Sequence, residues 1–214
     1  FVTLLSTPEQ KFAYLKNLFE ETYLTDIKKR YKLRKNNAEI DELLNILSSS
    51  IGSFTNPTKL SNTFQSLKNK SITRNTIEKY IEYIKDSFLI DEARQYDIKG
   101  KKYINSPRKY YFSDLGLRNA RINFRQLEES HSMENIIFNE LKLRGFNVDI
   151  GIVEQRIKDN KGNEQRKKIE IDFVANKGYN RYYIQSALAM PTLKKEQQEQ
   201  RSLIKINDSF KKII

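Results

Sequence analysis

Residues 167–187 read KKIEIDFVANKGYNRYYIQSA and contain two strand-like runs joined by a glycine-containing turn. Side chains on a strand point alternately to opposite faces, so Glu170 and Asp172, two positions apart, point to the same face. Gln185 and Ala187 repeat this spacing in the second run. The stretch therefore predicts a β-hairpin with two carboxylates on one face of its first strand and a polar position on the next.

The hairpin lies inside a longer run of predicted elements. In chain order these are a helix over 131–144, a strand over 146–154, the two strands of the hairpin, a polar helix over 191–206 and a short strand over 210–214. Helical periodicity and strand alternation support each assignment. The order helix, three strands, helix, strand predicts an α/β (α+β) domain over about 125–214.

Residues 1–35 have the pattern of a helical segment. Thr7 is suited to the N-cap position and Pro8 to the first helical position, and apolar residues follow at helical spacing. A second helical piece is expected after a kink near Thr25. The chain begins with Phe1, and we expect it to be part of something longer.

Residues 36–113 predict three short helices followed by a basic hairpin, which is the order of a winged helix-turn-helix. Asn56 is expected to cap the second helix and Thr73 the third. The third helix has one apolar stripe, made of Ile77, Ile81, Ile84 and Phe88. The hairpin turns at Lys99-Gly100-Lys101, the natural wing, and residues 114–124 are typical of a linker.

The chain is strongly basic, with 39 Lys and Arg against 27 Asp and Glu and a formal net charge of +12. Such an excess favours nucleic acid or another polyanion as a partner. Acids on the third helix (Glu78, Glu82 and Asp86) oppose phosphate contact there, so any DNA contact by this domain is expected mostly from the wing and the backbone. A winged helix used as a protein–protein or intramolecular brace is favoured over DNA contact. The candidate nucleic-acid contacts are Arg74, Asn75, Lys79, Lys99, Lys101, Lys102, Arg108 and Lys109.

The absence of cysteine excludes disulfides, thiolate metal ligands and cysteine nucleophiles, and it fits a reducing, cytoplasmic setting. No apolar run approaches 18 residues, so we expect no membrane segment. His131 is the sole histidine, at a predicted helix start, where capping or exposure explains it better than catalysis.

Several strings together resemble a known family. They include IGSFTNPTKLSNTF, TIEKYIEYIKDSFLI, KYYFSDLGLRNA, MENIIFNELKLRGFNV, EIDFVA and YYIQSA. In this order they look like the C-terminal half of a prokaryotic family of AAA+ ATPases, in which a P-loop module precedes a winged helix and a nuclease-like domain. No G-x-x-x-x-G-K-[ST] motif occurs in the sequence, so the resemblance implies no ATP-binding residue here and a P-loop ATPase module as partner elsewhere in the same protein.

The hairpin itself resembles the metal centre of the PD-(D/E)xK restriction-endonuclease-like fold. The resemblance implies Glu140 (or Glu134), Asp172 and Gln185 as metal ligands, with Glu170 as an additional acid. Ala187 stands where nucleases of this fold keep a lysine. The expected domain is therefore a degenerate nuclease with no cofactor, and Mg²⁺ is expected only if the site is active.

These patterns lead to one functional expectation and two alternatives. The expectation is a non-catalytic recognition or regulatory region of an AAA+ ATPase that contacts DNA or another macromolecule. One alternative is a Mg²⁺-dependent nuclease. The other is a protein-binding or oligomerisation module, with a homo-oligomer as its simplest form.

Overall fold

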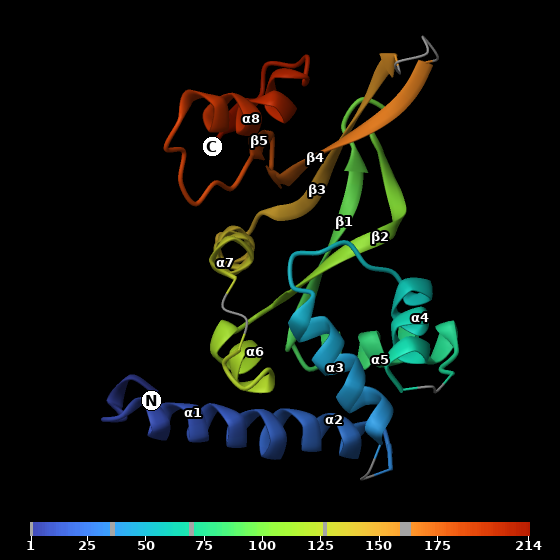
Figure 1. Ribbon diagram of the computed structural model, residues 1–214, viewed down its shortest axis with the longest axis vertical. Coiled ribbons are helices and arrows are strands. Elements are labelled where there is room, and N and C mark those ends of the chain that lie inside the picture. The colour runs from blue at the N-terminus through green and yellow to red at the C-terminus, as the bar shows by residue number, and fades with distance from the viewer. Residues whose placement is uncertain (1, 35–36, 69–70, 126–127, 159–163) are drawn as a thin grey trace. The chain divides into compact units, whose positions relative to one another are not determined.

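The computed structural model describes residues 2–34, 37–68, 71–125, 128–158 and 164–214. The chain forms two compact units, Phe1–Glu92 with Tyr110–Glu128 and Ala93–Lys109 with Glu129–Ile214. It passes between them along two strands, β1 (Ile90–Asp97) and β2 (Lys102–Phe112) (Figure 1). The predicted mixed α/β class is confirmed.

The first unit is mainly helical. Its helices are the 3₁₀ turn η1 (Val2–Leu4), α1 (Pro8–Asn17), the π-helical segment η2 (Leu18–Leu24), α2 (Thr25–Arg30), α3 (Ala38–Ser49), α4 (Pro57–Lys68), α5 (Arg74–Asp86) and α6 (Leu115–Arg121). Elements α1, η2 and α2 follow one another without leaving helical backbone, as the blue helix in Figure 1 shows. At Thr25, where a kink was expected, the backbone stays helical and passes from the π-helical segment η2 directly into α2.

The predicted helix starts are confirmed by their capping contacts. The Thr7 hydroxyl accepts a hydrogen bond from the Gln10 amide at 3.3 Å, and the Gln10 side chain accepts from the Thr7 amide, which makes a capping box. The Thr73 hydroxyl accepts from the Thr76 amide at 3.2 Å. Asn56 accepts from the amide of Lys59 at 2.7 Å. Each contact satisfies a backbone donor that a helix start leaves open.

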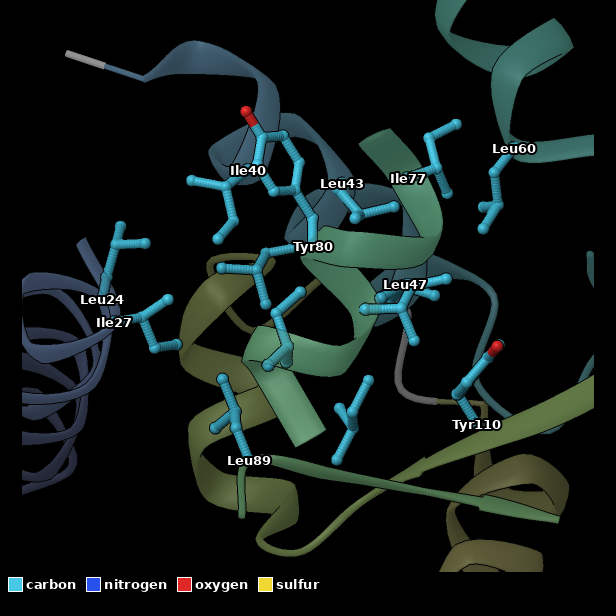
Figure 2. Close-up of a cluster of buried hydrophobic side chains, with 14 of the residues drawn as sticks. Leu24, Ile27, Ile40, Leu43, Leu47, Leu60, Ile77, Tyr80, Leu89 and Tyr110 are labelled. Carbon is cyan, nitrogen blue, oxygen red and sulfur yellow. The ribbon is translucent and has the colours of Figure 1, made fainter. Parts of the chain in front are cut away.

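One apolar core joins the helices of this unit (Figure 2). Residues buried in it include Phe19, Leu24, Ile27, Ile40, Leu43, Leu47, Leu60, Phe64, Ile77, Ile81, Ile84, Leu89 and Tyr110. Helices from the expected segment 1–35 thus share a core with the three helices that follow. The expected division into a helical segment, 1–35, and a winged helix, 36–113, therefore differs from the observed unit. The reason is that α3 and α5 cover the apolar faces of η2 and α2 in this shared core.

The predicted stripe on α5 is confirmed for three of its four members. Ile77, Ile81 and Ile84 are buried, but Phe88 is 82% exposed. The helix ends at Asp86, and Phe88 has a φ of 58°, which breaks the helical periodicity. The adjacent Leu89 is buried in its place.

The stretch 114–124, expected to be a linker with helical pieces, contains helix α6. Asp114 caps this helix by accepting from the Leu117 amide at 2.9 Å. Leu117 packs into the first core, and Arg118 is only 1% exposed and donates its Nε to the Ser48 carbonyl at 2.7 Å. A segment with this much burial is part of the unit rather than a connection between domains.

The second unit contains most of a six-stranded mixed sheet of order β2-β1-β3-β4-β5-β6. Its further elements are α7 (Glu129–Leu143), β3 (Asn147–Lys158), β4 (Glu164–Lys177), β5 (Asn180–Ile184), α8 (Leu193–Ile204) and β6 (Lys211–Ile213). Strand β4 is antiparallel to β3 and β5, whereas β3 pairs parallel with β1 and β6 parallel with β5. The element order predicted for 125–214 is confirmed.

The predicted hairpin is formed by β4 and β5, and Gly178 turns between them with a φ of 59°. Strand β5 ends at Ile184, so Gln185 and Ala187 follow the strand rather than lying on it. The Gln185 amide donates to the carbonyl of Ile213 at 2.9 Å. The core beneath this hairpin contains Ile98, Val153, Ile171, Val174, Tyr183, Leu203 and Ile206.

Candidate functional site

Acidic side chains and one lysine meet within the second unit. Glu170 and Asp172 come from β4, Glu134 from α7 and Lys109 from β2. The Lys109 Nζ lies 2.8 Å from Glu134 Oε1 and 2.5 Å from Glu170 Oε1. Lys109, Glu134 and Asp172 are all buried, with 4%, 7% and 9% exposure. We call these four residues the carboxylate cluster.

The lysine of the cluster is held in its charged form. Burial alone lowers the pKa of Lys109, but the carboxylates of Glu134 and Glu170 outweigh burial and raise it above its ordinary value. The ammonium therefore stays protonated at neutral pH and bridges two of the acids, offsetting one of their two negative charges. A buried charge is tolerated when it is paired and hydrogen-bonded in this way.

Asp172 is the most perturbed acid of the cluster. Burial, the largest cause, and the nearby Glu134 raise its pKa to about 6, against the opposing effect of hydrogen bonds from Ser186 and the charge of Lys109. Its Oδ2 accepts from both the Ser186 amide and the Ser186 hydroxyl, each at 2.7 Å. This oxygen is thus already committed to the segment that follows β5.

Two of the residues implied as metal ligands make other contacts. Glu140 forms an exposed ion pair with Arg144, which lies just beyond the end of α7. The Gln185 Oε1 accepts from the Ser202 hydroxyl of α8 at 3.2 Å. Of the two acids considered on α7, Glu134 is the one that joins the cluster.

The residues present do not fit a bound divalent ion. A Mg²⁺ ion requires about six oxygen ligands at roughly 2.0–2.1 Å in octahedral arrangement. Within the described parts of the chain, no group of three or more His, Cys, Asp or Glu side chains is arranged to hold a metal ion. The Lys109 ammonium lies between Glu134 and Glu170, where such an ion would need their oxygens.

The nucleic-acid candidates fall in both units. In the first unit, Arg74 is paired with Glu78 at 3.0 Å, Asn75 is exposed, and the Lys79 Nζ lies 5.8 Å from the centre of the Tyr83 ring. These contacts occupy Arg74 and Lys79 on the surface of α5. An acid beside Arg74 reduces the attraction of this helix for phosphate.

In the second unit, the turn between β1 and β2 carries exposed Lys99, Lys101 and Lys102. Arg108 is half-buried and donates its Nε to the Asn105 carbonyl at 3.2 Å. Lys109 was also predicted as a phosphate contact, but its burial in the carboxylate cluster removes it from the surface.

The turn adjoins the extended β3–β4 arm, as Figure 1 shows. A pocket of about 550 Å³ lies between them and is lined by Asp97, Lys99, Gly100, Glu154, Gln155 and Arg166. The Asp97 carboxylate accepts from the Gly100 amide at 2.9 Å, and Arg166 lies 3.9 Å from Glu154. We call Lys99, Lys101, Lys102 and Arg166 the basic tip.

Sequence reasoning missed three contributors to these sites. Lys109 lies in a strand whose next three residues are buried as well, so alternation gave no sign of its inward position. Ser186 lies in irregular backbone and has no local signature. Arg166 belongs to the β3–β4 arm, which pairs over a longer stretch than its apolar residues indicate.

His131 lies in the first turn of α7, with its Nδ1 4.0 Å from Glu134 Oε2.

The described chain is a mixed α/β protein with a buried lysine–carboxylate cluster and an exposed basic turn. Comparison with known families extends this description. The family described as Domain of unknown function (DUF8612) matches residues 2–128, and the chain belongs to that family. No solved structure matches the chain significantly.

Two curated relatives match along nearly the whole chain. An uncharacterized protein of Haemophilus influenzae is 32% identical over 204 residues, which covers 95% of this chain and 46% of the relative. An uncharacterized protein of Methanocaldococcus jannaschii is 29% identical over 197 residues, which covers 92% of this chain and 41% of the relative. The chain thus spans less than half the length of these relatives. Among the described residues, no helix has the length and apolar character needed to cross a membrane.

Proposed function

We propose that this chain is a non-catalytic recognition region that contacts nucleic acid through the basic tip. The observation that carries the proposal is the charge of the β1–β2 turn and the strand that follows. Residues 98–113 contain no acidic side chain and, besides the buried Lys109, four basic ones, of which Lys99, Lys101 and Lys102 are exposed. An exposed turn of this charge attracts the phosphate backbone through counterion release.

The arrangement of elements is compatible with the winged-helix interpretation. Helices α3, α4 and α5 precede the β1–β2 hairpin, and the turn of that hairpin corresponds to the wing. Phosphate contact by a wing needs exposed cations rather than a base-reading helix. The pairing of Arg74 with Glu78 on α5 favours the wing over the helix as the point of contact.

The proposal extends to the longer protein. We propose that the chain works in the cytoplasm beside a P-loop ATPase module of the same protein. ATP hydrolysis by that module would drive or regulate the contact with nucleic acid. The greater length of both curated relatives leaves room for such a module in them. The alternative role, a protein-binding or oligomerisation module, predicts self-association of this region, which light scattering measures directly.

Salt-dependent binding of labelled duplex DNA tests the proposal. We expect the affinity to fall steeply with salt, and the triple variant Lys99→Gln/Lys101→Gln/Lys102→Gln to reduce the log–log slope by about 2–3. A matched control removes three exposed charges from α8 and its C-cap, Lys194→Gln/Arg201→Gln/Lys205→Gln. Absence of salt-dependent binding, or an equal loss in both triple variants, would contradict the proposal.

A second candidate function, a Mg²⁺-dependent nuclease of the PD-(D/E)xK type, is favoured by one observation. Ala187 stands where nucleases of this fold keep a lysine, but Lys109, on another strand, contacts Glu134 and Glu170 of the carboxylate cluster. In that case Lys109 would have to release Glu134 and Glu170 for an ion. Plasmid cleavage that needs Mg²⁺ and disappears in Asp172→Asn would establish this function in place of the first.

A further inference from the structure

We infer that the Lys109 ammonium acts as a built-in cation that closes the carboxylate cluster to divalent metal ions. The inference rests on the proposal that the chain is non-catalytic. It adds a physical reason for that proposal, namely that the Lys109 ammonium keeps divalent ions out of the cluster. It predicts that removal of this one charge opens a divalent-cation site in a chain that otherwise lacks it.

The first argument is the position of the ammonium. Its Nζ is within hydrogen-bond distance of both Glu134 and Glu170, which come from different elements. A single cation that bridges carboxylates from a helix and a strand performs the neutralising role of a metal ion. The distance of 2.8 Å to Glu134 is that of an N–H···O bond, and both distances, 2.8 and 2.5 Å, exceed the roughly 2.0–2.1 Å of Mg²⁺ coordination.

The second argument is the state of the other possible ligands. The Asp172 Oδ2 accepts two hydrogen bonds from Ser186, and Gln185 accepts one from Ser202. Glu140 is paired with Arg144 on the exposed side of α7. A divalent ion in the wild-type protein would have to break several of these contacts as well as displace the lysine.

The third argument is charge balance. Three carboxylates lie around one ammonium, and Glu134 and Asp172 are nearly excluded from water. Loss of the ammonium would remove the cation that bridges the acids of α7 and β4, which is costly in a poorly hydrated site. Uptake of a hard dication by their oxygens is the simplest way to restore the balance.

The test is Mn²⁺ binding by the whole chain, measured by electron paramagnetic resonance and by calorimetric titration. The variant is Lys109→Met, which keeps an unbranched side chain of similar length without the charge. We expect the wild type to show only weak Mn²⁺ association without saturation. We expect Lys109→Met to bind one Mn²⁺, with an affinity at least about tenfold higher than that weak association. The control Lys168→Met removes an exposed lysine from the same strand as Glu170 and should behave as the wild type.

The double variant Lys109→Met/Asp172→Asn locates the ion, since it should lose most of the gained affinity. If Lys109→Met does not fold alone, the inference requires that millimolar Mn²⁺ restores its circular dichroism spectrum and thermal transition. A folded Lys109→Met without a Mn²⁺ site, an unfolded one that Mn²⁺ does not restore, or a Mn²⁺ site in the wild type that Asp172→Asn removes would each overturn the inference.

These outcomes are separate from those of the DNA-binding assay. Failure of salt-dependent DNA binding would remove the proposed partner without changing Mn²⁺ uptake. Failure of Mn²⁺ uptake in Lys109→Met would remove the metal-substitution role and leave DNA binding by the basic tip unaffected. The nuclease alternative predicts the opposite result, namely that the wild-type protein itself binds the metal ion.

Discussion

Replacement of Asp172 by Asn should stabilise the protein at alkaline pH and have little effect at acidic pH. Burial raises the pKa of Asp172 to about 6, so its ionised form is disfavoured in the folded state. Relative to an unfolded carboxyl near 3.9, this difference corresponds to about 3 kcal/mol of lost stability once the group is ionised. An amide removes that penalty, and its oxygen can still accept from the amide and hydroxyl of Ser186.

The sign of the pH dependence follows from the raised pKa. Between about pH 4 and pH 6 the folded state binds more protons at this group than the unfolded state, so stability falls as pH rises. Above pH 6 the penalty is complete and constant. The groups that act on Asp172 are the like charge of Glu134, which strengthens the effect, and the ammonium of Lys109 and the donors of Ser186, which oppose it.

Hydrogen bonds to an amide oxygen are weaker than those to a carboxylate, which reduces the gain. We therefore expect Asp172→Asn to raise the free energy of unfolding by about 1–3 kcal/mol at pH 8 and by close to nothing at pH 4. Urea denaturation at the two pH values, followed by circular dichroism, measures this difference. The control Asp26→Asn, an exposed partner of Arg30, should show no such gain at pH 8.

A destabilised Asp172→Asn at pH 8, or an equal effect at both pH values, would refute the reasoning. The first result would mean that the ionised carboxylate of Asp172 is itself stabilising, for instance through a bound cation. The second would mean that the substitution acts through packing or hydrogen bonding and that the titration of Asp172 is irrelevant to folding.

Two further predictions concern local structure. Thr73→Ala removes the hydroxyl that accepts from the Thr76 amide at the start of α5, and urea denaturation should show a loss of about 1 kcal/mol, whereas Thr73→Ser should restore most of it. Gly151→Ala would place a Cβ 2.9 Å from Val174 Cγ2 and 3.0 Å from Ile171 Cβ, and thermal unfolding should show a loss of about 1–3 kcal/mol; an unchanged stability would mean that β3 and β4 can move apart at no cost.

Elements set by local chemistry could be predicted from the sequence. Thr7, Asn56 and Thr73 each precede a helix and each cap it, because capping depends on a few adjacent residues. Glu170 and Asp172 both lie on the expected strand, β4, but its pairing with β3 shifts register between Asp149 and Gly151, opposite Asp172, and the buried residues there do not alternate. Phe88 was misplaced because nothing local marks the left-handed turn that ends the helical pattern after Asp86.

Contacts made across the sheet could not be predicted in this way. Lys109 precedes Glu134 by 25 positions and Glu170 by 61, and only the folded second unit joins them. A lysine in the middle of a basic stretch reads as a surface residue, and its inward position depends on which face of β2 the second unit covers. The pairing of Ser186 with Asp172 likewise depends on where β5 ends.

Burial explains why charges of opposite sign have different roles in the second unit. The buried acids are partly offset by Lys109, whereas Lys99, Lys101 and Lys102 are exposed to solvent. Without that ammonium the cluster would add one more negative charge to the unit that bears the basic tip, and long-range repulsion would weaken its attraction for phosphate. Partial neutralisation inside the cluster therefore serves recognition as well as folding. It lets a unit with acids in its interior present a net positive face without recruiting a metal ion.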